Sequence, residues 1–203
     1  MTEFAVAFLR WLLIFTSSAI VASITSRRNP KKAVYTMQLT MLFLSLAVIE
    51  LTGSPKRFGF APDFRYIIPA SILGFGTSLT LNLIEGNLST PGFLPERTIP
   101  RLLLLLLLAP LSEETLNRAL VEGYLLGYGH LWSAILFSTL LFALPHWMAF
   151  ETTEKKAFAV SGALTIGLSA GYFFALGGII PAFLLHSSAN LAGLPFQKLV
   201  KGP

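Results

Sequence analysis

Cysteine is absent from the 203-residue chain, and charged residues make up only 12% of it. The lack of cysteine excludes disulfides, thiolate nucleophiles and thiolate metal sites, so any catalysis must use oxygen and nitrogen groups. The shortage of charge accompanies 54% hydrophobic residues and a mean hydropathy of +0.68, which is too apolar for a soluble domain with a polar surface. We therefore expect an integral membrane protein.

Long apolar runs divide the chain into candidate membrane spans. A helix needs ~20 residues to cross a hydrocarbon core of ~30 Å. Seven spans are predicted, at residues 4–25, 33–51, 66–84, 99–128, 131–147, 158–176 and 179–195. Little sequence separates them, so residues 1–203 are expected to form a single all-α domain, a polytopic membrane bundle of about seven transmembrane helices.

Basic residues gather on alternate connections, and cytoplasmic loops of membrane proteins collect Lys and Arg. One side has Arg27, Arg28, Lys31, Lys32, Arg97, Arg101, Lys155, Lys156, Lys198 and Lys201. The pattern predicts the N-terminus outside and the C-terminus inside, and the short loops favour a prokaryotic inner membrane. The net charge of +5 needs only the anionic lipid bilayer as a partner, so no nucleic acid is expected. Because Arg10 interrupts the first run and no basic leader precedes it, a retained helix is expected rather than a cleaved signal.

The fourth span carries ionisable residues, which cost ~2.5 to 3.5 kcal/mol each at mid-membrane and usually mark function. Glu113 lies ~18 Å along the helix from Arg101, near the middle of the hydrocarbon. Glu114, Arg118 and Glu122 are four residues apart, so the arginine can pair with a carboxylate on either side. That ladder fits a structural role as well as a functional one. Glu113 points roughly 100° away and has no cation in its own helix, which favours function.

Two later spans each carry a histidine. Pro145 removes a backbone hydrogen bond and is expected to bend the fifth span, opening space beside His146. In the seventh span His186 and Asn190 are four residues apart and share a face. Each residue alone fits interhelical hydrogen bonding. Because all these polar groups must satisfy one another at membrane depth, a shared polar cavity is predicted.

Small residues recur at every fourth position of the sixth span, at Ala163, Gly167, Gly171 and Ala175. Such a stripe lets neighbouring backbones approach closely. This face is predicted to serve packing.

The polar residues form three motifs in chain order: Glu113-Glu114-x-x-x-Arg118, Phe142-x-x-x-His146 and His186-x-x-x-Asn190. On successive apolar helices this arrangement resembles the CPBP intramembrane proteases, the family of CAAX prenyl endopeptidases and bacteriocin-processing or self-immunity proteins. The resemblance covers residues 110–194. Leu116 and Asn117 stand where the family usually has apolar or aromatic residues, and Ala119 stands where glycine is common. These departures concern the shape of the helix and the choice of substrate.

The resemblance implies a glutamate-dependent endopeptidase that cuts a membrane-anchored or lipid-modified protein or peptide, near its C-terminus. It implies roles for six residues: Glu113 and His146 activate a water, His186 and Asn190 donate hydrogen bonds to the oxyanion, and Glu114 and Arg118 hold the site. A histidine and an amide are suitable donors to a developing negative charge.

Three alternatives remain open. Glu113, His146 and His186 are a legitimate ligand set for catalytic zinc, although no His-Glu-x-x-His signature exists and Arg118 puts positive charge where the metal would sit; a site without metal or cofactor is favoured. A proton-coupled transporter would also carry mid-membrane glutamates and histidines, but no related halves are found. A non-catalytic membrane scaffold or immunity protein would keep the fold and act by binding.

Overall fold

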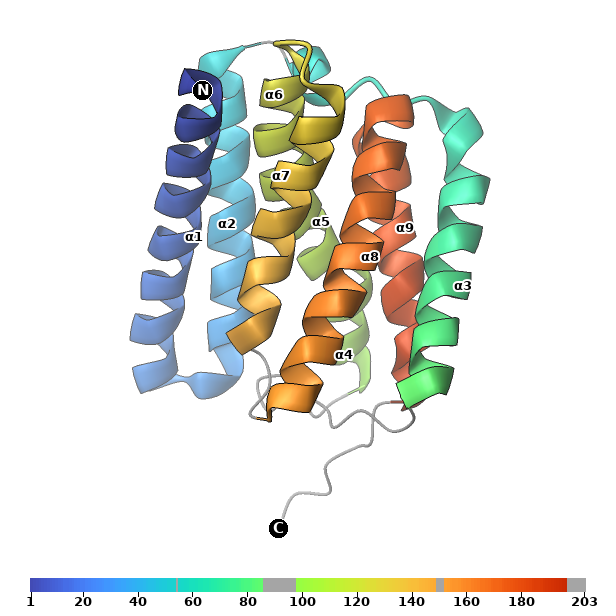
Figure 1. Ribbon diagram of the computed structural model, residues 1–203. Helices are drawn as coiled ribbons and strands as arrows, with labels where there is room; N and C mark the ends of the chain where they lie inside the picture. Colours follow the sequence, from blue (N-terminus) through green and yellow to red (C-terminus); the bar gives the residue numbers. More distant parts are fainter. Residues whose placement is uncertain (54, 86–97, 149–151, 197–203) are drawn as a thin grey trace.

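The computed structural model describes residues 1–53, 55–85, 98–148 and 152–196, and every secondary-structure element in these ranges is helical. The predicted all-α class is confirmed. The long helices stand side by side, with α1 (Thr2–Arg28) and α3 (Ile67–Glu85) at opposite edges (Figure 1). Arg97, Lys198 and Lys201, which the orientation prediction uses, lie outside the described residues.

The first half of the chain forms a helical hairpin and a more distant helix. α1 packs against α2 (Pro30–Thr52). Pro30 begins α2 because its missing N–H falls in the first turn, where no partner is available in any case. Two 3₁₀ turns, Pro55–Phe58 and Phe64–Tyr66, lead into α3.

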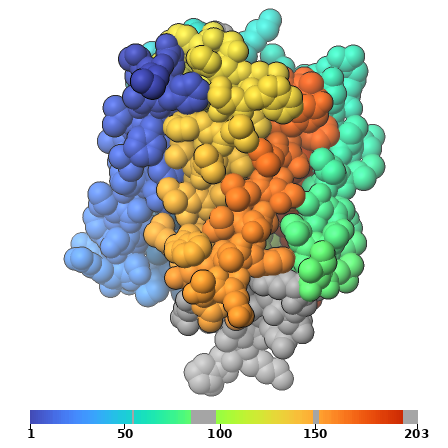
Figure 2. Space-filling model, in the orientation of Figure 1, coloured from blue at the N-terminus to red at the C-terminus, as the bar shows by residue number. Residues whose placement is uncertain are grey.

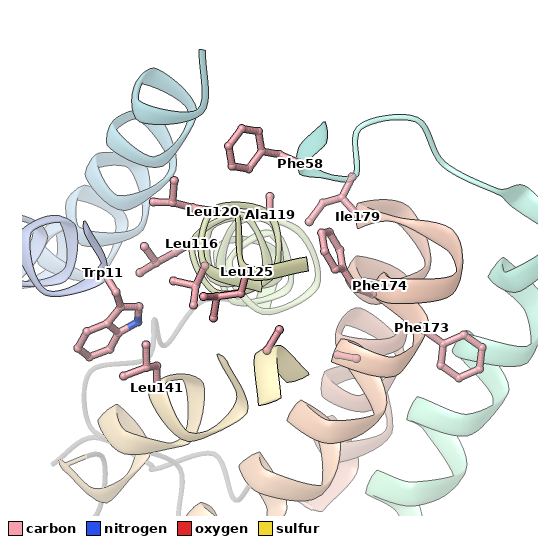
Figure 3. Close-up of a cluster of buried hydrophobic side chains, with 14 of the residues drawn as sticks. Trp11, Phe58, Leu116, Ala119, Leu120, Leu125, Leu141, Phe173, Phe174 and Ile179 are labelled. Atoms are coloured by element: carbon pink, nitrogen blue, oxygen red, sulfur yellow. The ribbon is translucent and has the colours of Figure 1, made fainter. Parts of the chain in front are cut away.

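The fourth segment is a broken helix at the centre of the molecule. It consists of α4 (Thr98–Leu103), α5 (Ala109–Glu114) and α6 (Gly123–Leu126), joined by π-helical stretches at Leu104–Leu108 and Thr115–Glu122. The second π-helical stretch contacts α1 and α2 as well as the helices that follow. Figure 3 shows this segment end-on, with its own apolar side chains and those of its neighbours around it.

The second half of the chain packs around that segment. α7 (Leu131–Ala143) continues as a 3₁₀ turn, Leu144–Met148. α8 (Thr153–Gly177) and α9 (Ile179–Gly193) pack on each other, and a last 3₁₀ turn spans Leu194–Phe196.

Gly178 links α8 to α9 in a left-handed conformation, with φ of 76°. A Cβ on Gly178 would lie 2.4 Å from the carbonyl oxygen of Gly59, so only glycine fits this turn.

Five helical stretches are long and apolar enough to cross a membrane: Thr2–Arg28, Pro30–Thr52, Phe64–Ile84, Leu131–Met148 and Thr153–Gly177. They correspond to five of the predicted spans. The apolar helix Ile179–Gly193 is shorter, and the fourth segment is interrupted by its π-helical stretches. The count of seven therefore stays a prediction.

Large apolar side chains cover the outward faces of these helices. Leu13, Phe43, Ile72 and Leu140 are 67%, 65%, 68% and 60% exposed. Figure 2 shows one side of the molecule, on which α1, α7, α8 and α3 lie. Contiguous apolar surface of this kind is rare on soluble monomers, and a bilayer would cover it.

The tightest helix approach predicts a stability effect at Gly74 in α3. A Cβ there would lie 2.1 Å from the carbonyl oxygen of Leu185 and 2.7 Å from Ser188 Oγ, both on α9. We expect Gly74→Ala to force the helices apart, to cost about 1–3 kcal/mol, and to lower the thermal unfolding midpoint in detergent by several degrees. Gly76→Ala is the matched control, because a Cβ at Gly76 meets nothing within 4 Å. Equal losses in both variants would contradict the close packing.

Candidate active site

Arg118 is the centre of a buried ion-pair network. Its side chain and those of Glu114 and Glu122 have no exposed surface. Arg118 Nε donates to Glu114 Oε2 at 3.1 Å, and Nη1 donates to Glu122 Oε2 at 3.1 Å. Ser138 on α7 accepts from Nη1 at 2.6 Å and donates to Glu122 Oε2 at 2.7 Å. The predicted pairing of one arginine with two carboxylates is confirmed.

Two glycines of α8 leave room for this network. A Cβ on Gly171 would lie 2.8 Å from Glu122 Oε2, and a Cβ on Gly167 would lie 3.3 Å from Arg118 Nη2. The small-residue stripe was predicted to bring helix backbones together. The atoms nearest to a Cβ at these two positions belong to side chains, both of α7 and of the charged groups in the central segment.

Glu113 points away from Arg118 and its carboxylate is held from α2. Gln38 Nε2 donates to Glu113 Oε1 at 3.0 Å, and Ser112 Oγ donates to Gln38 Oε1. The Glu113 side chain is 23% exposed, in contrast to its fully buried neighbour Glu114. The two adjacent carboxylates therefore have different surroundings, since one pairs with a cation and the other with a neutral amide.

Both histidines contact the Phe142 ring, whose centroid is 5.1 Å from that of His146 and 5.3 Å from that of His186. His186 Nδ1 lies 2.8 Å from Glu114 Oε1, and its Nε2 lies 3.9 Å from Glu113 Oε2. His146 lies on the 3₁₀ turn that ends α7, and its Nδ1 donates to the carbonyl oxygen of Phe142 at 3.0 Å. The change from α- to 3₁₀-helix around Pro145 agrees with the bend expected there.

Pro110 explains why the central helix widens at Leu104–Leu108. The N–H of Ala109 donates to the carbonyl oxygen of Leu104, five residues back. That bond removes the α-helical donor of the Leu105 carbonyl, and the next nitrogen along the chain belongs to Pro110, which has no hydrogen. A buried carbonyl left without a donor is costly, so a side chain must replace it.

α9 supplies the missing donors. Asn190 Nδ2 donates to the Leu105 carbonyl oxygen at 2.8 Å, and Ser187 Oγ donates to the Leu106 carbonyl oxygen. These bonds join α9 to the central segment beside the charged network. Interhelical hydrogen bonding was one of the two roles that the sequence left open for Asn190, and the structure identifies the Leu105 carbonyl as its partner.

A cavity of about 70 Å³ adjoins Glu113 and His146. Gln38 and Asn117 complete its polar lining, and the other lining residues are apolar, including Trp11 of α1. One water takes roughly 10–15 Å³ of such volume, so several waters fit. Of the six residues predicted to share one cavity, Glu113 and His146 line this one, whereas Glu114, Arg118, His186 and Asn190 do not.

Residues 95–192 match the family described as Rce1-like, type II CAAX prenyl endopeptidase. This segment, called the Rce1-like segment below, covers just under half of the 203-residue chain. The match contains all six predicted site residues and confirms the family that their motifs indicated, a family of membrane-embedded proteases. No curated protein and no solved structure matches the chain.

Within the Rce1-like segment the structure joins four predicted residues, Glu113, Glu114, Arg118 and His186, in one network, while His146 shares the cavity with Glu113. Sequence analysis missed Gln38 and Ser138. A lone glutamine inside an apolar span was a signal for the first, whereas a serine in a membrane helix is too common to indicate the second.

Among the described residues, no group of three or more His, Asp or Glu side chains is arranged to hold a metal ion. Glu113, His146 and His186, the ligands of the zinc alternative, are all among the residues described.

The network predicts a large stability loss for Arg118→Ala. The change leaves Glu114 and Glu122 buried without a cation, and breaking a buried pair costs about 3–5 kcal/mol. The thermal unfolding midpoint of the purified protein should fall sharply. Arg10→Ala is the control, since Arg10 lies over the Tyr124 ring at 4.5 Å and such a contact contributes about 0.5–2 kcal/mol. If Arg118→Ala unfolds at the wild-type temperature, the ion-pair assignment is wrong.

Proposed function

We propose that the chain is a glutamate-dependent intramembrane endopeptidase that cuts a membrane-anchored or lipid-modified protein near its C-terminus. The observation that carries this proposal is the position of Glu113 in the Rce1-like segment, half-buried, hydrogen-bonded to a neutral amide, and on the same cavity as His146. The large apolar surface favours a substrate that reaches the site from the bilayer.

The proposed first step is removal of a proton from a water in the cavity. His146 donates Nδ1–H to Phe142, so in the neutral ring the lone pair is on Nε2 and can accept a proton. Glu113 Oε1 is taken by Gln38, which leaves Oε2 as the second acceptor. As the proton leaves, the water oxygen attacks the peptide carbonyl carbon.

His186 and Asn190 are proposed to stabilise the oxyanion. With both ring nitrogens protonated, His186 donates Nδ1–H to Glu114 and keeps Nε2–H for the substrate. The positive charges of His186 and Arg118 then balance Glu114 and Glu122, which suits a site with little water. Asn190 Nδ2 carries two hydrogens; one is donated to Leu105, and the other is proposed for the oxyanion.

Breakdown of the tetrahedral intermediate completes the reaction. The proton taken from the water passes from Glu113 or His146 to the leaving nitrogen. The carbon–nitrogen bond then breaks, giving one carboxylate and one amine. No atom beyond peptide and water is required.

The proposed mechanism predicts that Glu113→Gln loses at least about 100-fold in peptidase activity, because general-base catalysis contributes about 10²–10⁴-fold. The amide keeps the shape of the side chain, so the variant should still insert and fold. New peptide termini in host membranes would be compared by mass spectrometry at matched expression. His146→Ala should behave similarly. Glu50→Gln, the same change at an exposed position of α2, is the control and should retain wild-type termini.

Two results would redirect the proposal. If a folded Glu113→Gln protein yields the same termini as wild type, proton or solute flux in liposomes becomes the test of the transporter alternative, and its absence would favour a scaffold. Activity should survive a chelator of divalent cations. Activity lost on chelation and restored by Zn²⁺ would instead indicate Glu113, His146 and His186 as metal ligands.

The proposed orientation has the N-terminus outside and the C-terminus inside a prokaryotic inner membrane. Because the chain has no cysteine, one introduced cysteine is a unique label. Lys56→Cys should react with a membrane-impermeant maleimide on intact cells, whereas Arg28→Cys should react only after lysis. The reverse pattern would invert the topology.

A further inference from the structure

Gln38 is a buried polar residue outside the Rce1-like segment, on α2, and it is 7% exposed. Its amide contacts two consecutive residues of the central helix. Nε2 donates to Glu113 Oε1 at 3.0 Å, and Oε1 accepts from the Ser112 hydroxyl. A polar side chain buried in an apolar helix costs free energy unless its donors and acceptors are hydrogen-bonded. These two contacts offset that cost.

The chemistry of the neighbours determines which way the amide faces. A carboxylate oxygen accepts hydrogen bonds and cannot donate one, so the NH₂ group must face Glu113. The amide oxygen then faces Ser112, whose hydroxyl can donate. The reversed amide would bring its oxygen against the oxygen of Glu113, with no hydrogen between them. Gln38 therefore acts as a fixed donor to one oxygen of Glu113.

We infer that Gln38 is the positioning residue of the proposed general base. The glutamate side chain has three rotatable torsions, and ordering such a chain costs up to about 2 kcal/mol. The Gln38 contact restrains Oε1, and Oε2 lies 3.9 Å from His186 Nε2. This inference rests on the proposed function, because the orientation of Glu113 affects a rate only if Glu113 takes part in a reaction.

A neutral amide suits this task better than a cation. Arg118 neutralises Glu114 through a charged contact, whereas Gln38 restrains Glu113 without pairing its charge. The two adjacent carboxylates thus have different partners. Glu114 forms an ion pair with Arg118, whereas Glu113 is oriented by Gln38 and its negative charge remains available for a proton.

The decisive comparison uses Gln38→Leu and Gln38→Glu in isolated membranes, with the rate of appearance of the Glu113-dependent termini as readout. Gln38→Leu should lower that rate by about tenfold to 100-fold, since small misplacements of a catalytic group have effects of this size. Gln38→Glu can donate to Glu113 only while it is protonated. Its activity should therefore fall with rising pH over a range in which the activity of the wild type stays constant. A purely structural role for Gln38 would not produce this pH dependence.

Ser45→Ala is the matched control. Ser45 lies on the same helix, is fully buried, and its hydroxyl has no hydrogen-bond partner. This variant removes a buried polar atom without touching Glu113, so its rate and pH profile should equal those of wild type. A Gln38→Leu protein with wild-type rate, or a Gln38→Glu protein with a wild-type pH profile, would overturn the inference.

A stability cycle separates failure of the inference from failure of the proposed function. Unfolding midpoints of Gln38→Leu, Glu113→Leu and the double variant report whether the two side chains interact, without any need for activity. If the two side chains are coupled but the protein yields no Glu113-dependent termini, the contact is real. The peptidase proposal is then refuted, and the positioning role with it. Absence of coupling would overturn the inference even in an active peptidase.

Discussion

The rest of the structure depends on the burial of one guanidinium group. Arg118 has no exposed surface, and a charge in that position is tolerable only if opposite charges and hydrogen-bond acceptors surround it. Glu114 and Glu122 come from its own helix, Ser138 from α7, and the space from two glycines of α8. The contacts of this one group therefore join three helices.

The second constraint is the interrupted backbone of the central segment. π-helical stretches turn side chains relative to an α-helix and often occur at functional sites. Here one stretch contains Arg118, and the other leaves a carbonyl that Asn190 must satisfy. Asn190 thus holds α9 against the helix that carries Glu113.

The α1–α2 hairpin completes the site from outside the Rce1-like segment. Trp11 Nε1 donates to Asn117 Oδ1 at 3.0 Å, and Gln38 donates to Glu113. Asn117 is one of the positions where the chain departs from the family pattern. Its amide accepts from α1 and donates to the Glu113 carbonyl oxygen at 2.8 Å, so the departure ties the first helix to the proposed catalytic residue.

The sequence by itself determined the helical class, five of the spans, the family and the pairing of Arg118, because these depend on apolar run length, residue order and spacing along one helix. Glu113 was also identifiable, as a carboxylate without a cation in its own helix. Only the tertiary structure decided that Gln38 faces Glu113, that Gly167 and Gly171 make room for charged side chains, and that Asn190 satisfies Leu105. Each of these contacts joins residues distant along the chain, and helical periodicity carries no information about which faces of different helices meet.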